Sequence, residues 1–136
     1  MRSVIFHLVG VTRQMVAECL AEISTPNGPA GWRMPRGAAT SDLYIDFYDN
    51  LLEEVEPGEL DQLRASLGRL PDVSVAVHVS GRVSGDAEVR ELAAYVLGKF
   101  SGVVQDEYTL HCWTLAEIQS DAVVEGHPFF DYRGSR

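Results

Sequence analysis

The sequence predicts an α+β fold, a two-layer sandwich in which a mostly antiparallel four-stranded sheet carries its helices on one face. Strand-like and helix-like segments alternate along the chain in the order β-α-β-α-β-α-β-α. Two of the strand segments alternate apolar and polar residues, which is typical of a sheet covered on one side only. A doubly wound parallel sheet would show continuous apolar strands instead, so a three-layer α/β fold is the second choice.

The first two predicted elements are a central strand and a helix. Residues 4–9 form a short β-prone run, and Thr12 follows at a position from which it can cap the next helix. The apolar residues of that helix recur on one face: Met15, Val16, Cys19, Leu20 and Ile23. Residues 24–40 hold three prolines and three glycines, so we predict a loop that is longer than most connections.

The two alternating segments predict half-buried strands in the middle of the chain. Residues 43–48 place three apolar side chains on one face. Their polar or amphipathic neighbours on the other face are Tyr44, Asp46 and Tyr48. Residues 73–80 place four valines on one face. The polar side chains opposite those valines include Ser74, His78 and Ser80.

Helix starts and stops are marked in the second half of the chain. Pro57 suits the first turn of a helix and Gly68 its end. Ser84 can cap the strongest helix. Its core stripe is Val89, Leu92, Ala93, Val96, Leu97 and Phe100. Thr114 and Glu117 have the spacing of a capping box, which predicts a short helix that follows directly.

The last predicted strand covers residues 103–108, and the aromatic tail at 126–132 is expected to pack back on the domain. With four strands and an extra helix between the second and the third, the element order favours a ferredoxin-like arrangement. A chain of 136 residues suits one domain, residues 1–136, and is long enough to bury roughly two-thirds of its unfolded surface.

The strongest compositional signal is acidic. The net charge is −9, and between residues 41 and 63 there are eight carboxylates and no Lys or Arg. They are Asp42, Asp46, Asp49, Glu53, Glu54, Glu56, Glu59 and Asp61. A fixed negative surface attracts basic partners and repels nucleic acid, so a basic protein is the expected partner and nucleic acid is not. The alternative is a solvated charged face without a partner.

The remaining composition points to a reducing, cytoplasmic setting. Two cysteines, Cys19 and Cys112, do not make a disulfide framework, and we expect both to be buried thiols. The N-terminal apolar run is too short for a signal peptide, and no run approaches 18 apolar residues, so no membrane span is expected.

The uncovered sheet face carries the residues that could do chemistry. It is predicted to gather Tyr44, Asp46, Tyr48, Ser74, His78, Ser80, His7 and Asp106. Of these, His7, Asp46 and His78 could hold a transition metal or act as a general acid and base. They could equally be polar residues on a wet face. A third interpretation is that this face binds a protein or a second copy of the chain, with the tyrosines as anchors.

Other motifs give no enzyme class. His111 and Cys112 are adjacent in sequence, but the local motifs of cysteine enzymes are missing. The glycines form neither a dinucleotide fingerprint nor a phosphate loop, and no nucleophile elbow is present. We therefore expect no cofactor.

Three segments near the C-terminus carry a resemblance. Gly-Val-Val-Gln-Asp-Glu-Tyr at 102–108, His-Cys-Trp-Thr-Leu-Ala-Glu-Ile at 111–118 and Gly-His-Pro-Phe-Phe-Asp-Tyr at 126–132 resemble the ending of small uncharacterised actinobacterial proteins. Some of those resemble immunity proteins of polymorphic toxin systems. The resemblance implies a cytoplasmic protein that binds and blocks a cognate toxin without catalysis or cofactor, and it carries no inhibitory residue over to this chain.

The resulting hypothesis is a non-catalytic binding protein of the immunity-inhibitor type that uses its acidic surface against a basic partner. The contact residues predicted from charge are Asp46, Asp49, Glu53 and Glu54, with Tyr44 and Tyr48 as anchors. The alternatives are the metal or acid/base site at His7, Asp46 and His78, and a ligand-sensing module that associates with itself as a homodimer.

Overall fold

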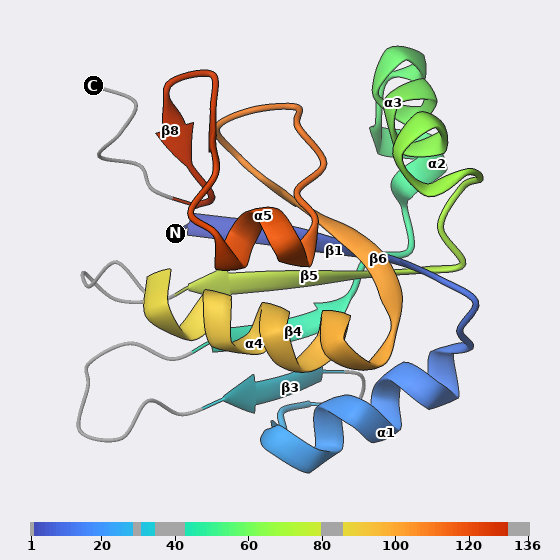
Figure 1. The fold of residues 1–136 in the computed structure, drawn as a ribbon. Coiled ribbons are helices and arrows are strands. Elements are labelled where there is room, and N and C mark those ends of the chain that lie inside the picture. Colours follow the sequence, from blue (N-terminus) through green and yellow to red (C-terminus); the bar gives the residue numbers. More distant parts are fainter. Residues whose placement is uncertain (1, 29–30, 35–42, 80–85, 131–136) are drawn as a thin grey trace.

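The computed structural model describes residues 2–28, 31–34, 43–79 and 86–130 (Figure 1). Within them, six strands form one antiparallel sheet in the order β2-β3-β4-β5-β1-β6. The strands are β1 (Arg2–Val9), β2 (Thr25–Pro26), β3 (Gly31–Met34), β4 (Leu43–Phe47), β5 (Val73–Val79) and β6 (Ser101–Asp106). The helices are α1 (Arg13–Ile23), α2 (Leu51–Glu54), α3 (Pro57–Leu67), α4 (Asp86–Lys99) and α5 (Leu115–Gln119). A small hairpin of β7 (Val123–Val124) and β8 (His127–Pro128) follows. The predicted α+β class with an antiparallel sheet is confirmed.

The prediction of four strands is wrong, because the segment predicted to be a loop adds β2 and β3 to the sheet. Gly28 has a φ of 78°, which lets the chain reverse there, and the Asn27 N–H donates to the Gly31 carbonyl at 2.9 Å. Pro26 has no N–H to give to a ladder, and it lies in the edge strand, where prolines are tolerated. Pro26 and Gly28 are therefore compatible with a hairpin.

The first face of the sheet carries the main core. In the paired register, Phe6 of β1 lies between Val75 of β5 and Val104 of β6, and all three side chains are buried. The helix residues buried in the same cluster are Val16, Cys19 and Leu20 of α1 and Val89, Leu92, Ala93 and Val96 of α4. These helices cover one face, as predicted from their apolar stripes.

A second, smaller cluster lies on the opposite face and corrects the prediction that all helices share one face. Leu63 of α3 packs with Val103 and Cys112, and Val103 points away from its neighbour Val104 in the main core. Figure 1 shows α2 and α3 together, apart from α1, α4 and α5. As a result β5 is buried on both faces, and Ser74 is only 6% exposed where a wet face was predicted.

The structure contains three of the helix caps and helix ends that were predicted from the sequence. The Thr12 side chain accepts a hydrogen bond from the Met15 N–H, and Thr114 with Glu117 forms the predicted capping box. Gly68 ends α3 in the left-handed region at φ 83°. Ser84, the predicted cap of α4, lies outside the described residues, as do Asp42 and Ser80. None of the helices in the described ranges is long and apolar enough to cross a membrane.

We expect Gly102→Ala to destabilise the fold by about 1–3 kcal/mol, which is typical of overpacking. A Cβ at Gly102 would lie 2.4 Å from the His7 carbonyl oxygen, a backbone atom that cannot move aside cheaply. Gly98→Ala is the matched control, because nothing lies within 4 Å of a Cβ there and Gly98 is in helix α4. Urea unfolding should therefore show changes of opposite sign, with Gly98→Ala neutral or stabilising by up to about 1 kcal/mol. Equal stabilities for the two variants would contradict the close approach.

Candidate functional site

Two of the predicted site residues, Asp46 and His78, meet on the second face of the sheet. The Asp46 Oδ1 lies 3.8 Å from the His78 Nε2, and both side chains are accessible to water. Tyr44 is the register partner of His78 on one side and of Arg33 on the other. This group lies on β4 and β5, the two middle strands of the sheet.

The structure does not bring His7 to this pair. Ser3 is the register partner of His78, whereas His7 pairs with Ser74, four residues along the strand. At about 3.3 Å per residue, His7 and His78 are separated by about 13 Å along the sheet. Among the described residues, no group of three or more His, Cys, Asp or Glu side chains could hold a metal ion. His7, Asp46 and His78 therefore do not form one site.

His7 is instead the centre of a buried polar chain. Its Nδ1 lies 2.9 Å from the Ser74 hydroxyl and its Nε2 lies 3.0 Å from the Gln105 Oε1. The Gln105 Nε2 donates to the Leu110 carbonyl at 3.2 Å, so the Gln105 Oε1 is left to accept from His7. This fixes the tautomer: Nε2–H donates to Gln105, and Nδ1 accepts from Ser74.

The same surroundings hold the His7 imidazole neutral. Burial lowers its pKa to about 4, and the hydrogen bond to Gln105 opposes that shift only in part. His7 is 0% exposed. The prediction that it lies on an open face is wrong, because the α2–α3 segment covers the sheet there: Leu51 and Val55 line a cavity together with His7.

Asp106, also predicted on the open face, points to the other side of the sheet. It is the register partner of Val4 and therefore shares the face of the main core. Its carboxylate accepts backbone N–H bonds from Tyr108 at 3.1 Å, Thr109 at 3.2 Å and Phe130 at 2.9 Å. Asp106 thus fixes the aromatic C-terminal hairpin, where Phe129 and Phe130 are buried as the tail prediction required.

Both cysteines are buried, as predicted. Burial raises the pKa of the Cys112 thiol, and His111 directs its Nε2 to the Glu117 carboxylate at 3.0 Å. Cys112 packs under α3 in the second cluster. This surrounding is typical of a structural thiol and not of a nucleophile.

We call the acidic residues of 49–61 the acidic cap, and three of them, Glu53, Glu54 and Glu59, lie near Tyr48. The Tyr48 hydroxyl donates to the Glu54 Oε1 at 3.1 Å. The pKa of Tyr48 is raised first by burial, then by this hydrogen bond and by the nearby charges of Glu54, Glu53 and Glu59. Three carboxylates from α2 and α3 therefore lie within electrostatic reach of one phenol.

Not all carboxylates of the acidic cap are available to a partner. Asp49 forms an ion pair with Arg13 of α1, and Arg13 also lies 4.0 Å over the Phe47 ring. Asp61 pairs with Arg64 at 3.3 Å within α3. In the part of the chain that the structure describes, no Lys or Arg forms an ion pair with the four remaining acids. Those are Glu53, Glu54, Glu56 and Glu59.

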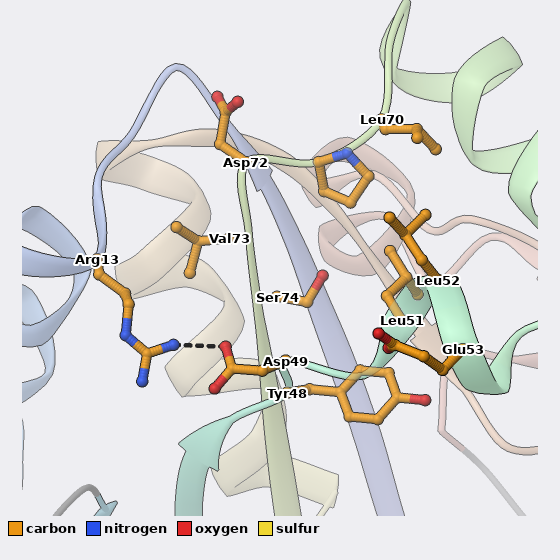
Figure 2. Close-up of a pocket in the computed structure, with 11 residues that line it drawn as sticks. Arg13, Tyr48, Asp49, Leu51, Leu52, Glu53, Leu70, Asp72, Val73 and Ser74 are labelled. Atoms are coloured by element: carbon orange, nitrogen blue, oxygen red, sulfur yellow. Dashed lines mark hydrogen bonds and ion pairs between the residues drawn. The ribbon is translucent and has the colours of Figure 1, made fainter.

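A cavity of about 250 Å³ opens beside the acidic cap. Figure 2 shows Arg13 joined to Asp49 on one side, with Tyr48, Glu53 and Leu52 on the other. The remaining lining residues are Leu51, Leu70, Pro71, Asp72, Val73 and Ser74. Leu52, at the rim of the cavity, is 66% exposed.

The sequence identified one wall of this cavity and missed the other. Tyr48, Asp49 and Glu53 were predicted from charge, whereas Arg13 and residues 70–74 come from distant segments that no local pattern connects. Asp72 does not add free charge, because it accepts from Arg69 at 2.7 Å and from the Gly10 N–H at 2.6 Å. Among the carboxylates that line the cavity, Glu53 is the one without an ion pair in the described residues, so the cavity combines apolar walls with a mixed rim of Arg13 and acids.

Comparison with protein-family models gave no match, and comparisons with curated proteins and with solved structures gave none either. What this chain binds has to be inferred from its own geometry.

Proposed function

We propose that this chain is a non-catalytic binding protein of the immunity-inhibitor type, which engages a basic region of a protein partner through the acidic cap. The observation that carries the proposal is the group of Glu53, Glu54 and Glu59 around the Tyr48 hydroxyl, with no Lys or Arg paired to them among the described residues. A partner that supplies an arginine or lysine would compensate these charges.

The surroundings of Tyr48 favour a protein partner over a small ion. The exposed Leu52 and the apolar walls of the cavity offer an area to bury, and tyrosine is a common anchor of protein interfaces. Tyr44 and Asp46 extend the same sheet face along β4, so a partner docked on the acidic cap would reach them. Nucleic acid is disfavoured because its phosphates repel the same carboxylates.

We further propose that the fold is an elaborated ferredoxin-like sandwich and that the protein works in the cytoplasm. The four longer strands run in the spatial order β4-β5-β1-β6, which supports the first proposal. The hairpin of β2 and β3 and the α2–α3 segment are then additions to that arrangement. Two unpaired, buried cysteines are in keeping with a reducing compartment.

Charge reversal in the acidic cap tests the proposed surface. We expect the double change Glu53→Lys and Glu54→Lys to weaken binding of a fluorescent nona-arginine peptide by about tenfold or more in anisotropy titrations. The matched control is Glu18→Lys with Glu91→Lys, which alters the net charge equally at exposed positions of α1 and α4. Because all four positions are exposed, thermal midpoints should change little. An equal loss of affinity in both variants would show that only net charge matters and would contradict the site.

The inhibitory part of the proposal needs a physiological partner. Where a basic protein is encoded directly beside this chain, we expect co-expression to relieve the growth defect that the basic protein causes. The acidic-cap variant should relieve it less than the matched control does. Full relief by the acidic-cap variant would argue that inhibition uses another surface.

A further inference from the structure

We infer that residues 49–67, which contain α2 and α3, form a lid that opens as one unit from the second face of the sheet. In the open state the rest of the sheet and the layer of α1 and α4 remain folded. This conformational device is independent of the partner proposed above, since it concerns only how the segment is attached.

The lid is held by little buried surface. The second cluster contains three buried side chains, Leu63, Val103 and Cys112, and only Leu63 belongs to the lid. Leu51, Leu60 and Leu67 add partly buried contacts. The main core, by contrast, joins α1 and α4 to the sheet through many fully buried residues. Segments with few buried apolar contacts are the ones that open locally below the free energy of global unfolding.

The helices of the lid are also weak on their own. Neither Asn50 at the start of α2 nor Glu56 at the start of α3 makes a side-chain cap hydrogen bond. The two helices span 4 and 11 residues, and helices of such length are marginal in water without packing. Four glutamates without ion pairs among the described residues add like-charge repulsion in this segment.

A few polar contacts keep the lid closed. The Gln62 Nε2 donates to the Leu110 carbonyl at 2.6 Å, and the Ser66 side chain lies near the Cys112 thiol. At the other end, Arg13 holds Asp49. On the lid side these contacts are made by the side chains of Gln62, Ser66 and Asp49, which are partly or fully exposed to water, so they position the lid without fixing it strongly.

Opening would change the shape of the second face. The cavity of about 250 Å³ lies on one side of α2, and a second one of about 180 Å³ lies on the other. Leu51 lines both, so α2 is the partition between them. The chain from Ser74 through His7 to Gln105 runs beneath this partition from one cavity to the other. Removing α2 would leave one groove with that polar floor.

The reactivity of Cys112 can be used to measure opening of the lid, because Cys112 is 4% exposed and its thiol lies near Ser66 of α3. The experiment follows the reaction of 5,5′-dithiobis(2-nitrobenzoic acid) with the full chain carrying Cys19→Ser, so that only Cys112 reacts. We expect the logarithm of the rate to depend on urea with a slope below half of the equilibrium m value. A slope equal to the equilibrium value would mean that Cys112 reacts only through global unfolding, and it would overturn the lid.

Two variants separate the lid from fraying of the loop that contains Cys112. Leu63→Ala should accelerate the reaction at least about 30-fold, which corresponds to about 2 kcal/mol at 1.4 kcal/mol per factor of ten. Leu110→Ala makes the same chemical change at an exposed side chain of that loop and should leave the rate unchanged. Should Leu63→Ala fail to fold, the half-buried Leu60 gives a milder variant, Leu60→Ala, with acceleration of a few fold. Equal rates for the lid variants and Leu110→Ala would overturn the inference.

Discussion

Replacing Asp106 by alanine is expected to lower the free energy of unfolding by about 3–4 kcal/mol, although the residue has no part in the proposed binding surface. Its carboxylate accepts three backbone N–H bonds, one of them the buried bond from Phe130. Hydrogen bonds to a charged acceptor contribute about 1.5–3 kcal/mol each, and three that share one acceptor are not additive. The variant leaves all three donors without their partner.

Urea unfolding measures this effect directly. Asp106→Asn should recover part of the loss, since a carboxamide keeps one acceptor oxygen. Glu107→Ala is the matched control, an exposed acid one residue along that accepts a single bond from the Ser3 N–H at 3.1 Å, and it should cost about 1 kcal/mol or less. A loss below about 1 kcal/mol for Asp106→Ala would mean that packing and the arginine bonds to the Phe129 and Phe130 carbonyls hold this segment without Asp106.

The second large effect is a loss of stability in mild acid that originates at His7. In the folded chain its pKa is lowered to about 4, whereas an unfolded histidine titrates near its ordinary value of 6.5. Below pH 6.5 the unfolded state therefore binds a proton that the folded state does not. The contribution of the neutral His7 to the free energy of unfolding is fully present above pH 6.5. It is lost as the pH falls from 6.5 to about 4, by about 3 kcal/mol in all.

Comparing the pH dependence of unfolding of the natural chain with that of a His7 variant separates the contribution of His7 from that of the carboxylates. His7→Gln removes the titrating group, so its free energy of unfolding should fall less steeply than that of the natural chain between pH 6.5 and 4.5. The variant is expected to be less stable at pH 7.5, because Gln cannot reproduce both hydrogen bonds of the imidazole. His78→Gln, at a side chain 36% exposed, is the matched control. If the free energy of unfolding fell equally with pH for His7→Gln and for the natural chain, a neutral, buried His7 would be contradicted.

Features encoded by neighbouring residues could be predicted from the sequence. The Thr12 cap, the Thr114 and Glu117 box and the Gly68 stop each depend on side chains within a few positions of the backbone they serve. The alternation in β4 likewise follows from one buried face. These signals are local, so tertiary contacts did not alter them.

Features that depend on contacts between distant segments could not be predicted from the sequence. The apolar residues of α3 are consistent with either face of the sheet, and nothing nearby in sequence indicates that Leu63 meets Val103. Once α3 covers the second face, His7 and Ser74 become buried, so the described part of the predicted open face shrinks to Tyr44, Asp46, Tyr48 and His78. Asp49 was predicted to contact a basic partner, whereas Arg13 of this chain reaches it from 36 positions away.

The end of β6 shows how one side chain moved a predicted boundary. The apolar pattern predicted a strand through Tyr108, but the strand ends at Asp106. The Asp106 carboxylate takes the N–H groups of Tyr108 and Thr109, so the backbone turns there instead of continuing the ladder. The strand propensity of the following residues was overridden by this local hydrogen bonding.

The two edge strands of the sheet restrict how this chain can aggregate or assemble. At one margin β2 is only two residues long and includes Pro26, and at the other Val104 exchanges two backbone hydrogen bonds with Trp113. An edge strand that is short, contains a proline or is already hydrogen-bonded is a poor template for pairing with a strand of another chain. Such pairing is the geometry of amyloid growth and of domain swapping. Recruitment of another molecule by main-chain ladder extension is therefore disfavoured, and contacts made by side chains on the flanks of the sheet are left to supply specificity.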